Sequence, residues 1–215
     1  MLIKKRLTNI IYNKKFILAS SSKSRYKLLN NNHLNFTTIY PSCDETMLKK
    51  KFIKKKYKPQ KISIELAKAK ARSIKKNKTK QSLVVGCDTV IEFNGVLVDK
   101  ARNMKEAKKN LQKLSNKRHT IFSSIVVFVN NRICWKNTQK TSIKIRKLTE
   151  KEINRYLKGV GTDILNSVGC YQIEKKGPNI IENIKGDYFN VMGLPLFPFL
   201  VFLKKQNKTL FNKND

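Results

Sequence analysis

A short apolar segment, residues 15–19, runs into three consecutive serines at 20–22 and then into a segment with helical spacing, residues 24–30. We expect a buried strand, a tight polar turn and a helix whose leucines face the core. In this arrangement the backbone N–H groups at the start of the helix point at whatever lies above the turn. The chain is therefore restricted to folds in which a strand leads directly into a helix.

The same alternation continues through the rest of the 215 residues. Apolar runs predict further strands, and apolar residues three or four positions apart predict further helices. The expected strands are residues 35–40, 82–93, 96–98, 119–129, 132–137 and 141–148, and the expected helices are residues 62–74, 104–114 and 196–204. Asn94 and Gly95 form a two-residue hairpin signal, and Thr149 with Glu152 forms a capping box that starts another helix. Strands that alternate with helices and hairpins predict an α/β fold with a mixed sheet.

No repeat or linker divides the chain, so we expect one domain over residues 15–205, preceded by a basic extension at 1–14 and followed by a polar tail at 206–215. The longest apolar run, residues 191–203, is shorter than the ~20 residues that cross a bilayer, so no membrane association is expected. The basic extension lacks the apolar stretch of a secretory signal. We expect a cytoplasmic protein, and targeting to an organelle by this extension stays open.

The chain carries 47 lysines and arginines against 14 acidic residues, a formal net charge of +33. A charge of this size suggests a nucleic-acid-binding protein, which we keep as the alternative function. The lysines are spread along the whole chain, however, and their densest run, residues 49–58, falls where we expect a loop before a helix. No aromatic ladder is interleaved with them to stack on bases. A lysine bias on solvated surfaces is therefore the favoured interpretation, and it predicts loose, salt-sensitive binding of polyanions.

Hydroxyl groups and cations converge where the first helix begins. Ser20, Ser22, Lys23 and Arg25 lie within six residues of one another. Fixed hydrogen-bond donors and positive potential are what an anionic phosphate chain requires. The same residues also fit an ordinary helix that is capped by a serine, so this segment alone does not decide between the two interpretations.

Asp88 interrupts an apolar strand. Burial of a carboxylate is unfavourable unless a metal ion, a basic partner or a place at the edge of a cleft compensates for it. Glu45 follows another strand, and Lys70 and Lys100 supply cations. Two carboxylates would hold Mg²⁺ or Mn²⁺ against phosphate groups, while the lysines neutralise the charge that develops during the reaction. The alternative is an aspartate that bonds the local backbone at the end of a strand.

Two further residues bear on function. His119 opens an apolar strand, where a structural role is favoured over a catalytic one. Glu174 ends the segment 169–174, and it is the member of that segment that we expect to meet a ligand. The glycines and the proline of residues 184–195 indicate tight backbone geometry, which is mainly a folding constraint.

Taken together, six ordered segments resemble the Maf family of nucleoside triphosphate pyrophosphatases, relatives of the inosine triphosphatase fold. The segments are residues 18–29 (LASSSKSRYKLL), 44–46 (DET), 66–71 (LAKAKA), 86–89 (GCDT) with Lys100, 114–119 (LSNKRH) and 186–195 (GDYFNVMGLP). No single segment is specific, but their order and spacing extend over nearly the whole chain.

The resemblance implies a mixed, twisted β-sheet flanked by helices, in two lobes around a central cleft. It also implies hydrolysis of a nucleoside triphosphate to the monophosphate and pyrophosphate, dependent on Mg²⁺ or Mn²⁺, and it suggests a homodimer. Asp88 would act as the general base or as a metal-organising acid, and Glu45 as a metal ligand. The phosphate-binding groups would be Ser20, Ser22, Arg25, Lys70 and Lys100.

The positions that separate branches of the family by base are Ser24, Thr89 and Glu174. Thr89 resembles the branch that takes dTTP and UTP, whereas Glu174 resembles the branch that takes 7-methyl-GTP. The choice of substrate therefore stays open, with a slight preference for non-standard or methylated nucleotides. Asn166 and Ser167 replace an acid and a lysine of the family pattern. A protein that binds nucleotides without cutting them is therefore a further alternative.

Overall fold

The computed structural model describes residues 15–74 and 82–211, with side chains as far as residue 206. The predicted extension at 1–14 and residues 212–215 of the predicted tail lie outside the described residues. The elements follow in the order β1 (Phe16–Ala19), α2 (Lys23–Asn31), β2 (Phe36–Ile39), α3 (Glu45–Lys54), α4 (Pro59–Arg72), β3 (Val84–Phe93), β4 (Val96–Val98), α5 (Met104–Leu114), β5 (Arg118–Val129), β6 (Arg132–Ile145), α6 (Glu150–Val160), three short 3₁₀ turns η2 (Thr162–Asn166), η3 (Val168–Cys170) and η4 (Gly177–Asn179), β7 (Ile181–Lys185), α7 (Tyr188–Val191) and α8 (Leu196–Phe211).

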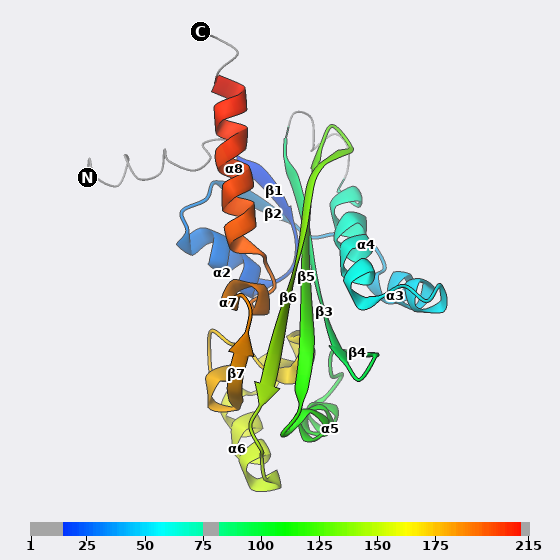
Figure 1. The fold of residues 1–215 in the computed structure, drawn as a ribbon, viewed down its shortest axis with the longest axis vertical. Coiled ribbons are helices and arrows are strands. Elements are labelled where there is room, and N and C mark those ends of the chain that lie inside the picture. The colour runs from blue at the N-terminus through cyan, green and yellow to red at the C-terminus, as the bar shows by residue number, and fades with distance from the viewer. Residues whose placement is uncertain (1–14, 75–81, 212–215) are drawn as a thin grey trace, which may run out of the picture.

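The described strands form one seven-stranded sheet in the order β2-β1-β3-β5-β6-β7, with β4 paired to β3. β1 runs parallel to β2 and to β3, and the other neighbouring strands are antiparallel. The long strands β3, β5 and β6 extend through most of the length of the molecule (Figure 1). The predicted α/β fold with a mixed sheet flanked by helices is confirmed.

Helices cover both faces of the sheet. α2 and α8 lie on one face, α4 lies on the other, and α5 and α6 close the end that is lower in Figure 1. α4 lies so close to β3 that a Cβ atom added at Gly86 would come within 2.1 Å of the carbonyl oxygen of Ala67. This close packing brings α4 directly over the middle of β3, where Asp88 lies. Within the described residues, no helix has the length and apolar composition needed to cross a membrane.

The local signals at two turns are confirmed. Asn94 and Gly95 both have positive φ angles, 51° and 78°, and connect β3 to β4 as the hairpin signal predicts. Thr149 caps α6, because its side chain accepts a hydrogen bond from the N–H of Glu152 while the Glu152 carboxylate accepts one from the N–H of Thr149. The strand, serine turn and helix at the start of the domain are also present, as β1 and α2.

The lysine-rich run between 49 and 58 was predicted to be a loop, and this prediction is wrong. The run lies largely in α3. Asp44 caps this helix by accepting a hydrogen bond from the N–H of Met47 at 2.9 Å. Leu48 and Phe52, one helical turn apart, pack against a small apolar cluster formed by Ile62 and Leu66 of α4 and Val90 of β3. Lysine is itself a good helix former, so a single apolar stripe is enough to hold the helix in place.

Two strand boundaries also differ from the prediction. The expected strands 132–137 and 141–148 are one continuous strand, β6, because Thr138, Gln139 and Lys140 pair with β5 without interruption. The backbone ladder depends on N–H and C=O groups and not on side-chain polarity, so a polar stretch does not end the strand. At the end of the chain α8 continues to Phe211, past residue 204, where the helix was expected to end.

His119 on β5 is a buried structural residue, as expected. Its side chain is 3% exposed, and its Nε2 shares a hydrogen bond with the hydroxyl of Tyr171 at 2.5 Å. Burial lowers the pKa of His119 from 6.5 to about 4. The imidazole is therefore neutral in the folded protein at pH 7.

This lowered pKa predicts a loss of stability in acid. The unfolded chain binds a proton at His119 below pH 6.5 and the folded protein does so only near pH 4, so the free energy of unfolding falls as the pH falls between these values. The shift corresponds to about 3 kcal/mol. Urea unfolding of His119→Gln should lack this decline, whereas His33→Gln, which changes an exposed histidine, should retain it. Parallel curves for the wild type and His119→Gln would refute this assignment.

Candidate active site

The serine turn between β1 and α2 is held by its own hydroxyl groups. Ser22 caps α2, with its Oγ accepting a hydrogen bond from the N–H of Arg25 at 3.3 Å. Ser20 is 2% exposed, and its Oγ accepts a hydrogen bond from the N–H of Ser22 at 3.2 Å. Since the free N–H groups of a helix carry partial positive charge, the start of α2 suits an anion.

Arg25 lies behind this turn and is held entirely by neutral acceptors. Its guanidinium donates to the carbonyl oxygen of Gly193 at 2.7 Å, to Oγ1 of Thr89 at 2.9 Å and to Oγ of Ser20 at 3.3 Å. The residue is 7% exposed, and it forms no ion pair with any carboxylate of the described residues. A nearly buried cation without a counter-ion favours the binding of an anion beside it.

The two predicted acids meet on one lysine. Lys70 on α4 places its Nζ 2.7 Å from Oδ1 of Asp88 on β3 and 2.8 Å from Oε2 of Glu45 at the start of α3. Burial by itself lowers the pKa of Lys70, but Asp88 and Glu45 outweigh this and raise it above its ordinary value. Lys70 therefore remains charged and joins three elements that are far apart in the sequence.

Asp88 has one carboxylate oxygen to spare. The residue is 5% exposed, and its Oδ2 is buried without any hydrogen-bond partner among the described residues. An unpartnered carboxylate oxygen in a buried place is costly unless a ligand completes it. Glu45, in contrast, keeps contact with solvent, with 43% of its side chain exposed. Of the two acids, Asp88 therefore lies in the interior and Glu45 lies at the solvent-exposed surface.

The donor set fits a magnesium-like ion that is shared with a substrate. Within the described chain, no three His, Cys, Asp or Glu side chains come together as a metal site. Mg²⁺ does not need such a cage, because it is commonly held by one or two carboxylates together with substrate phosphates and water. Glu45 and the free oxygen of Asp88 are donors of this kind.

Lys100 follows β4 and completes the group of cations. Its pKa is lowered, first by partial loss of solvent and then by the positive charge of Lys70, while Glu45 raises it and Arg25 lowers it further. Lys100 is therefore close enough to all of these residues to sense their charge. A second cation near Lys70 is unfavourable in the empty protein and becomes favourable when a polyanion lies between the two.

The three residues expected to select the base occupy two places. Ser24 on α2 donates a hydrogen bond from its Oγ to Oε1 of Glu174 at 2.5 Å, although 150 positions separate them. Thr89 instead bonds Arg25. Ser24 and Glu174 thus form one wall of the site, whereas Thr89 belongs to the arginine. The ten residues that the sequence singled out form three bonded groups, which are Ser24 with Glu174, Ser20 and Ser22 with Arg25 and Thr89, and Glu45 with Lys70 and Asp88, while Lys100 senses the charge of the third group.

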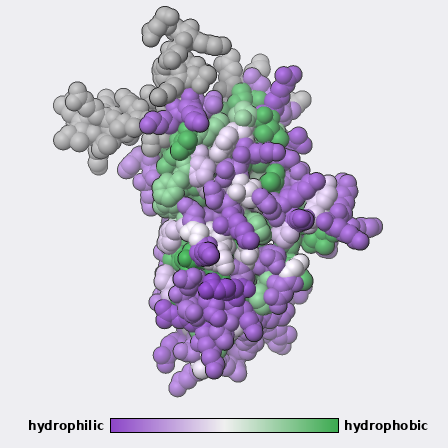
Figure 2. Space-filling model, in the orientation of Figure 1, coloured by the Kyte–Doolittle hydropathy of each residue, from purple (hydrophilic) through white to green (hydrophobic). Residues whose placement is uncertain are grey.

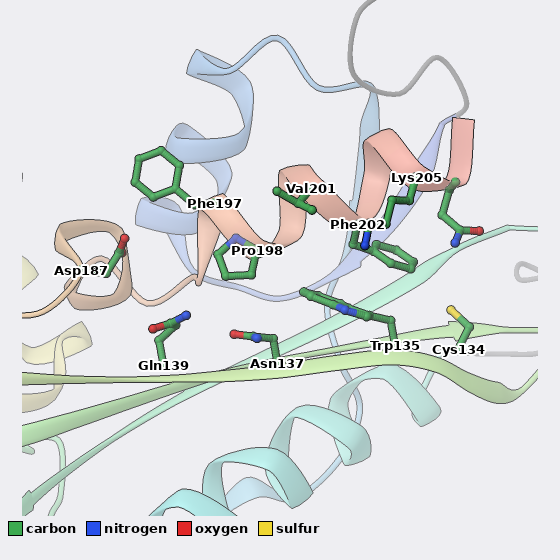
Figure 3. A pocket seen from close by; sticks show the side chains of 11 residues that line it. Cys134, Trp135, Asn137, Gln139, Asp187, Phe197, Pro198, Val201, Phe202 and Lys205 are labelled. Carbon is green, nitrogen blue, oxygen red and sulfur yellow. The ribbon is translucent and has the colours of Figure 1, made fainter. Parts of the chain in front are cut away.

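One hollow of the structure lies beside this site, and a larger one lies away from it. A hollow of about 310 Å³ lies beside the serine turn and is lined by Ser20, Tyr26 and Tyr40, among others. A larger groove of about 680 Å³ lies between β6 and α8, where Trp135 stacks on Phe202 (Figure 3). None of the predicted site residues lines this groove. Figure 2 shows apolar surface gathered over α8 on an otherwise largely hydrophilic face.

Three residues of the site were not anticipated from the sequence. Gly193 supplies the carbonyl that holds Arg25, and Ser123 on β5 bonds Thr89 at 2.8 Å. Tyr188 on α7 is 44% exposed, and the negative charge of Glu174 contributes, after burial, to raising its pKa. Gly193 and Tyr188 lie in the segment 186–195, whose glycines were interpreted mainly as a folding constraint. A tyrosine that stays exposed beside a carboxylate could not be recognised without the fold.

Comparison with known proteins assigns the chain to a family. Residues 15–206 match the family model described as Maf-like protein. The chain belongs to the Maf family. A 7-methyl-GTP pyrophosphatase of Bartonella quintana (strain Toulouse) is 42% identical over 188 residues, which are 87% of this chain and 93% of that protein. A protein of the same name from Bartonella henselae is 39% identical over 188 residues, with the same coverage of both chains.

A third relative carries a broader name. The nucleoside triphosphate pyrophosphatase of Caulobacter vibrioides is 33% identical over 187 residues, which are 87% of this chain and 93% of that protein. The resemblance inferred from six short segments is thereby confirmed over nearly the whole length of this Maf protein.

Proposed function

We propose that this Maf protein hydrolyses nucleoside triphosphates to the monophosphate and pyrophosphate and so removes unwanted nucleotides from the cellular pool. The observation that carries the proposal is the contact of Lys70 with both the buried Asp88 and the solvent-facing Glu45, together with Arg25, a nearly buried cation without a counter-ion among the described residues. The names of the relatives in Bartonella and Caulobacter support the same reaction.

The triphosphate would lie across the start of α2. Ser20, Ser22 and the free N–H groups of the helix would donate hydrogen bonds to it, and Arg25 would neutralise its charge from behind. Lys70 and Lys100 would stabilise the charge that develops on the leaving pyrophosphate. In the reaction a water oxygen bonds to the α-phosphorus, the bond from this phosphorus to the bridging oxygen breaks, and pyrophosphate leaves with that oxygen.

Asp88 would receive the proton of the attacking water. Its Oδ2 is the atom available for this, because Oδ1 already accepts a hydrogen bond from Lys70. Glu45 and Asp88 are also the residues that would hold a divalent ion, Mg²⁺ or Mn²⁺. Such an ion supplies Lewis-acid polarisation of the phosphate oxygens. Lys70 holds both carboxylates in place, because it bonds each of them.

For the base we propose 7-methylguanine over thymine or uracil. Methylation at N7 gives the guanine ring a positive charge. Glu174 offers a carboxylate to such a ring, and Tyr188, whose pKa the charge of Glu174 helps to raise, has an exposed ring that offers an aromatic face. Thr89, the residue that resembles the dTTP and UTP branch, bonds Arg25 and Ser123 and makes no hydrogen bond to Ser24 or Glu174 within the described residues.

A panel of triphosphates, assayed for pyrophosphate release with Mg²⁺ or Mn²⁺, tests the reaction and the base together. Glu174→Gln removes the charge but keeps an oxygen for Ser24, so it should reduce the ratio of kcat/KM for 7-methyl-GTP to that for GTP by about tenfold. Glu182→Gln, the same change at an exposed position of β7, should leave the ratio unchanged. Wild-type preference for dTTP or UTP would overturn the assignment of the base.

The alternative of a nucleic-acid-binding protein has its own prediction. The lysines of α3 are mostly exposed, so salt-sensitive binding of polyanions is expected whatever the enzyme does. A surface for nucleic acid gains nothing from the buried Asp88, however. Binding that is tight near physiological salt, survives Asp88→Ala and is accompanied by no turnover would favour this alternative.

Tight binding of one nucleotide without turnover would favour a non-catalytic binder. A homodimer and a cytoplasmic location remain predictions.

A further inference from the structure

A chain of hydroxyl groups connects Arg25 to the opposite side of the site. Arg25 Nη2 donates to Oγ1 of Thr89 at 2.9 Å, Oγ1 of Thr89 lies 2.8 Å from Oγ of Ser123, and Ser123 donates to the carbonyl oxygen of Asn190 at 2.8 Å. Ser123 and Asn190 are both fully buried. The chain crosses from α2 through β3 and β5 to α7 by direct hydrogen bonds between protein groups.

The two ends of this chain determine the direction of every proton in it. A guanidinium can only donate and a carbonyl oxygen can only accept. Ser123 has one hydroxyl proton, which goes to Asn190, so Ser123 must accept from Thr89. Thr89 then has its proton directed at Ser123 and its lone pairs directed at Arg25. All the donors therefore point the same way, from the arginine towards α7.

We propose that Ser123 is a positioning residue for the triphosphate, because it orients Thr89 and thereby holds the guanidinium of Arg25. This inference rests on the proposed function, in which Arg25 binds phosphate. Without Ser123, the acceptor left for the Thr89 proton among the described residues is the carbonyl oxygen of Gly193, 3.4 Å away, which already accepts from Nε of Arg25 at 2.7 Å. Thr89 would then share this acceptor with Arg25 and turn away from its present orientation.

Asn190, whose carbonyl oxygen accepts the last hydrogen bond of this chain, is itself held in place. The Asn190 side chain donates from Nδ2 to Oγ1 of Thr141 at 2.9 Å, and Thr141 donates to the carbonyl oxygen of Asp187 at 3.1 Å. Asp187 in turn caps α7, with its carboxylate accepting from the N–H of Asn190 at 2.6 Å. α7 also carries Tyr188, whose pKa the charge of Glu174 helps to raise. Ser123 thus connects the phosphate end of the site to the helix at its base end.

The next residue of β5 provides a matched control. Ser124 is as deeply buried as Ser123, and it also makes two hydrogen bonds, to Ser63 and Thr138. Successive residues of a strand point to opposite faces of a sheet, so Ser124 has no contact with the arginine. Ser124→Ala therefore removes the same atom and the same number of hydrogen bonds, but away from Arg25.

The test compares Ser123→Ala and Ser124→Ala in two assays. Ser123→Ala should raise the KM for 7-methyl-GTP about tenfold with kcat changed less than about threefold, and Ser123→Thr, which restores a hydroxyl, should recover most of the loss. Ser124→Ala should change KM less than about twofold, and any effect through Asp88, its cross-strand partner, should appear in kcat. Calorimetric titration with inorganic tripolyphosphate and Mg²⁺ should show the same tenfold weakening for Ser123→Ala alone.

The titration separates a failure of this inference from a failure of the proposed function, because it does not depend on turnover. If the wild type binds tripolyphosphate and releases no pyrophosphate, the activity is wrong and the role of Ser123 is still measured. Equal KM and Kd values for Ser123→Ala and Ser124→Ala would overturn the proposal. If Ser123→Ala does not fold, Thr89→Val breaks the same chain at the preceding link. It should weaken tripolyphosphate binding by a similar factor, and no weakening would overturn the proposal equally.

Discussion

Asp88→Asn should lower kcat/KM for pyrophosphate release by about 10³-fold, a size typical of the loss of a positioned general base. The amide keeps the shape of the side chain but cannot accept the proton of the attacking water, and it is a weaker ligand for a divalent ion. The measurement is a steady-state assay of pyrophosphate with 7-methyl-GTP and Mg²⁺. The loss should appear mainly in kcat, because Arg25 and the serine turn still bind the triphosphate.

Asp163→Asn is the matched control for this variant. Asp163 is an exposed acid in η2 whose nearest cation, Lys175, lies 3.7 Å away. The control removes one negative charge with the same change of atoms, so it should leave kcat/KM within about twofold. Comparable activity of Asp88→Asn and the wild type would remove Asp88 from the reaction.

The second large effect concerns stability. Lys70→Met should lower the free energy of unfolding by about 3 kcal/mol, because it leaves Asp88 buried and charged without its partner. Urea unfolding at pH 7 measures the change. In the background of Lys70→Met, Asp88→Asn should recover part of the lost stability, since it removes the charge that has no partner. A double-mutant cycle isolates this coupling.

Lys68→Met, on the same helix, is the control for stability. Lys68, two residues before Lys70, pairs with Glu65 at 2.7 Å in a less buried ion pair, so its loss should change the free energy of unfolding by less than about 1 kcal/mol. Equal effects of Lys68→Met and Lys70→Met would mean that the contacts of Lys70 with the two acids contribute little to stability.

Much of the fold can be predicted from the spacing of apolar residues and from local turn and capping signals. The serine turn, the hairpin at Asn94 and the capping box at Thr149 each depend on interactions within a few residues, so their positions were predictable. The course of α3 was not, because lysines obscure the one apolar stripe formed by Leu48 and Phe52. The continuity of β6 was not either, because its middle is held by backbone pairing with β5.

The site divides in the same way. Asp88 was predictable because an acid in an apolar strand demands a partner, but the identity of that partner was not. Lys70 is one of many lysines, and only the packing of α4 on β3 brings its Nζ between Asp88 and Glu45. The hydroxyl chain through Ser123 depends on side chains from β3, β5 and α7, which no local pattern connects.

The most direct test of the central claim is hydrolysis of 7-methyl-GTP by the wild-type protein in ¹⁸O-labelled water with Mg²⁺. Attack at the α-phosphorus predicts equal amounts of nucleoside monophosphate and pyrophosphate, with the label in the monophosphate alone. Release of orthophosphate and diphosphate, label in the pyrophosphate, or no turnover of any triphosphate would contradict the account.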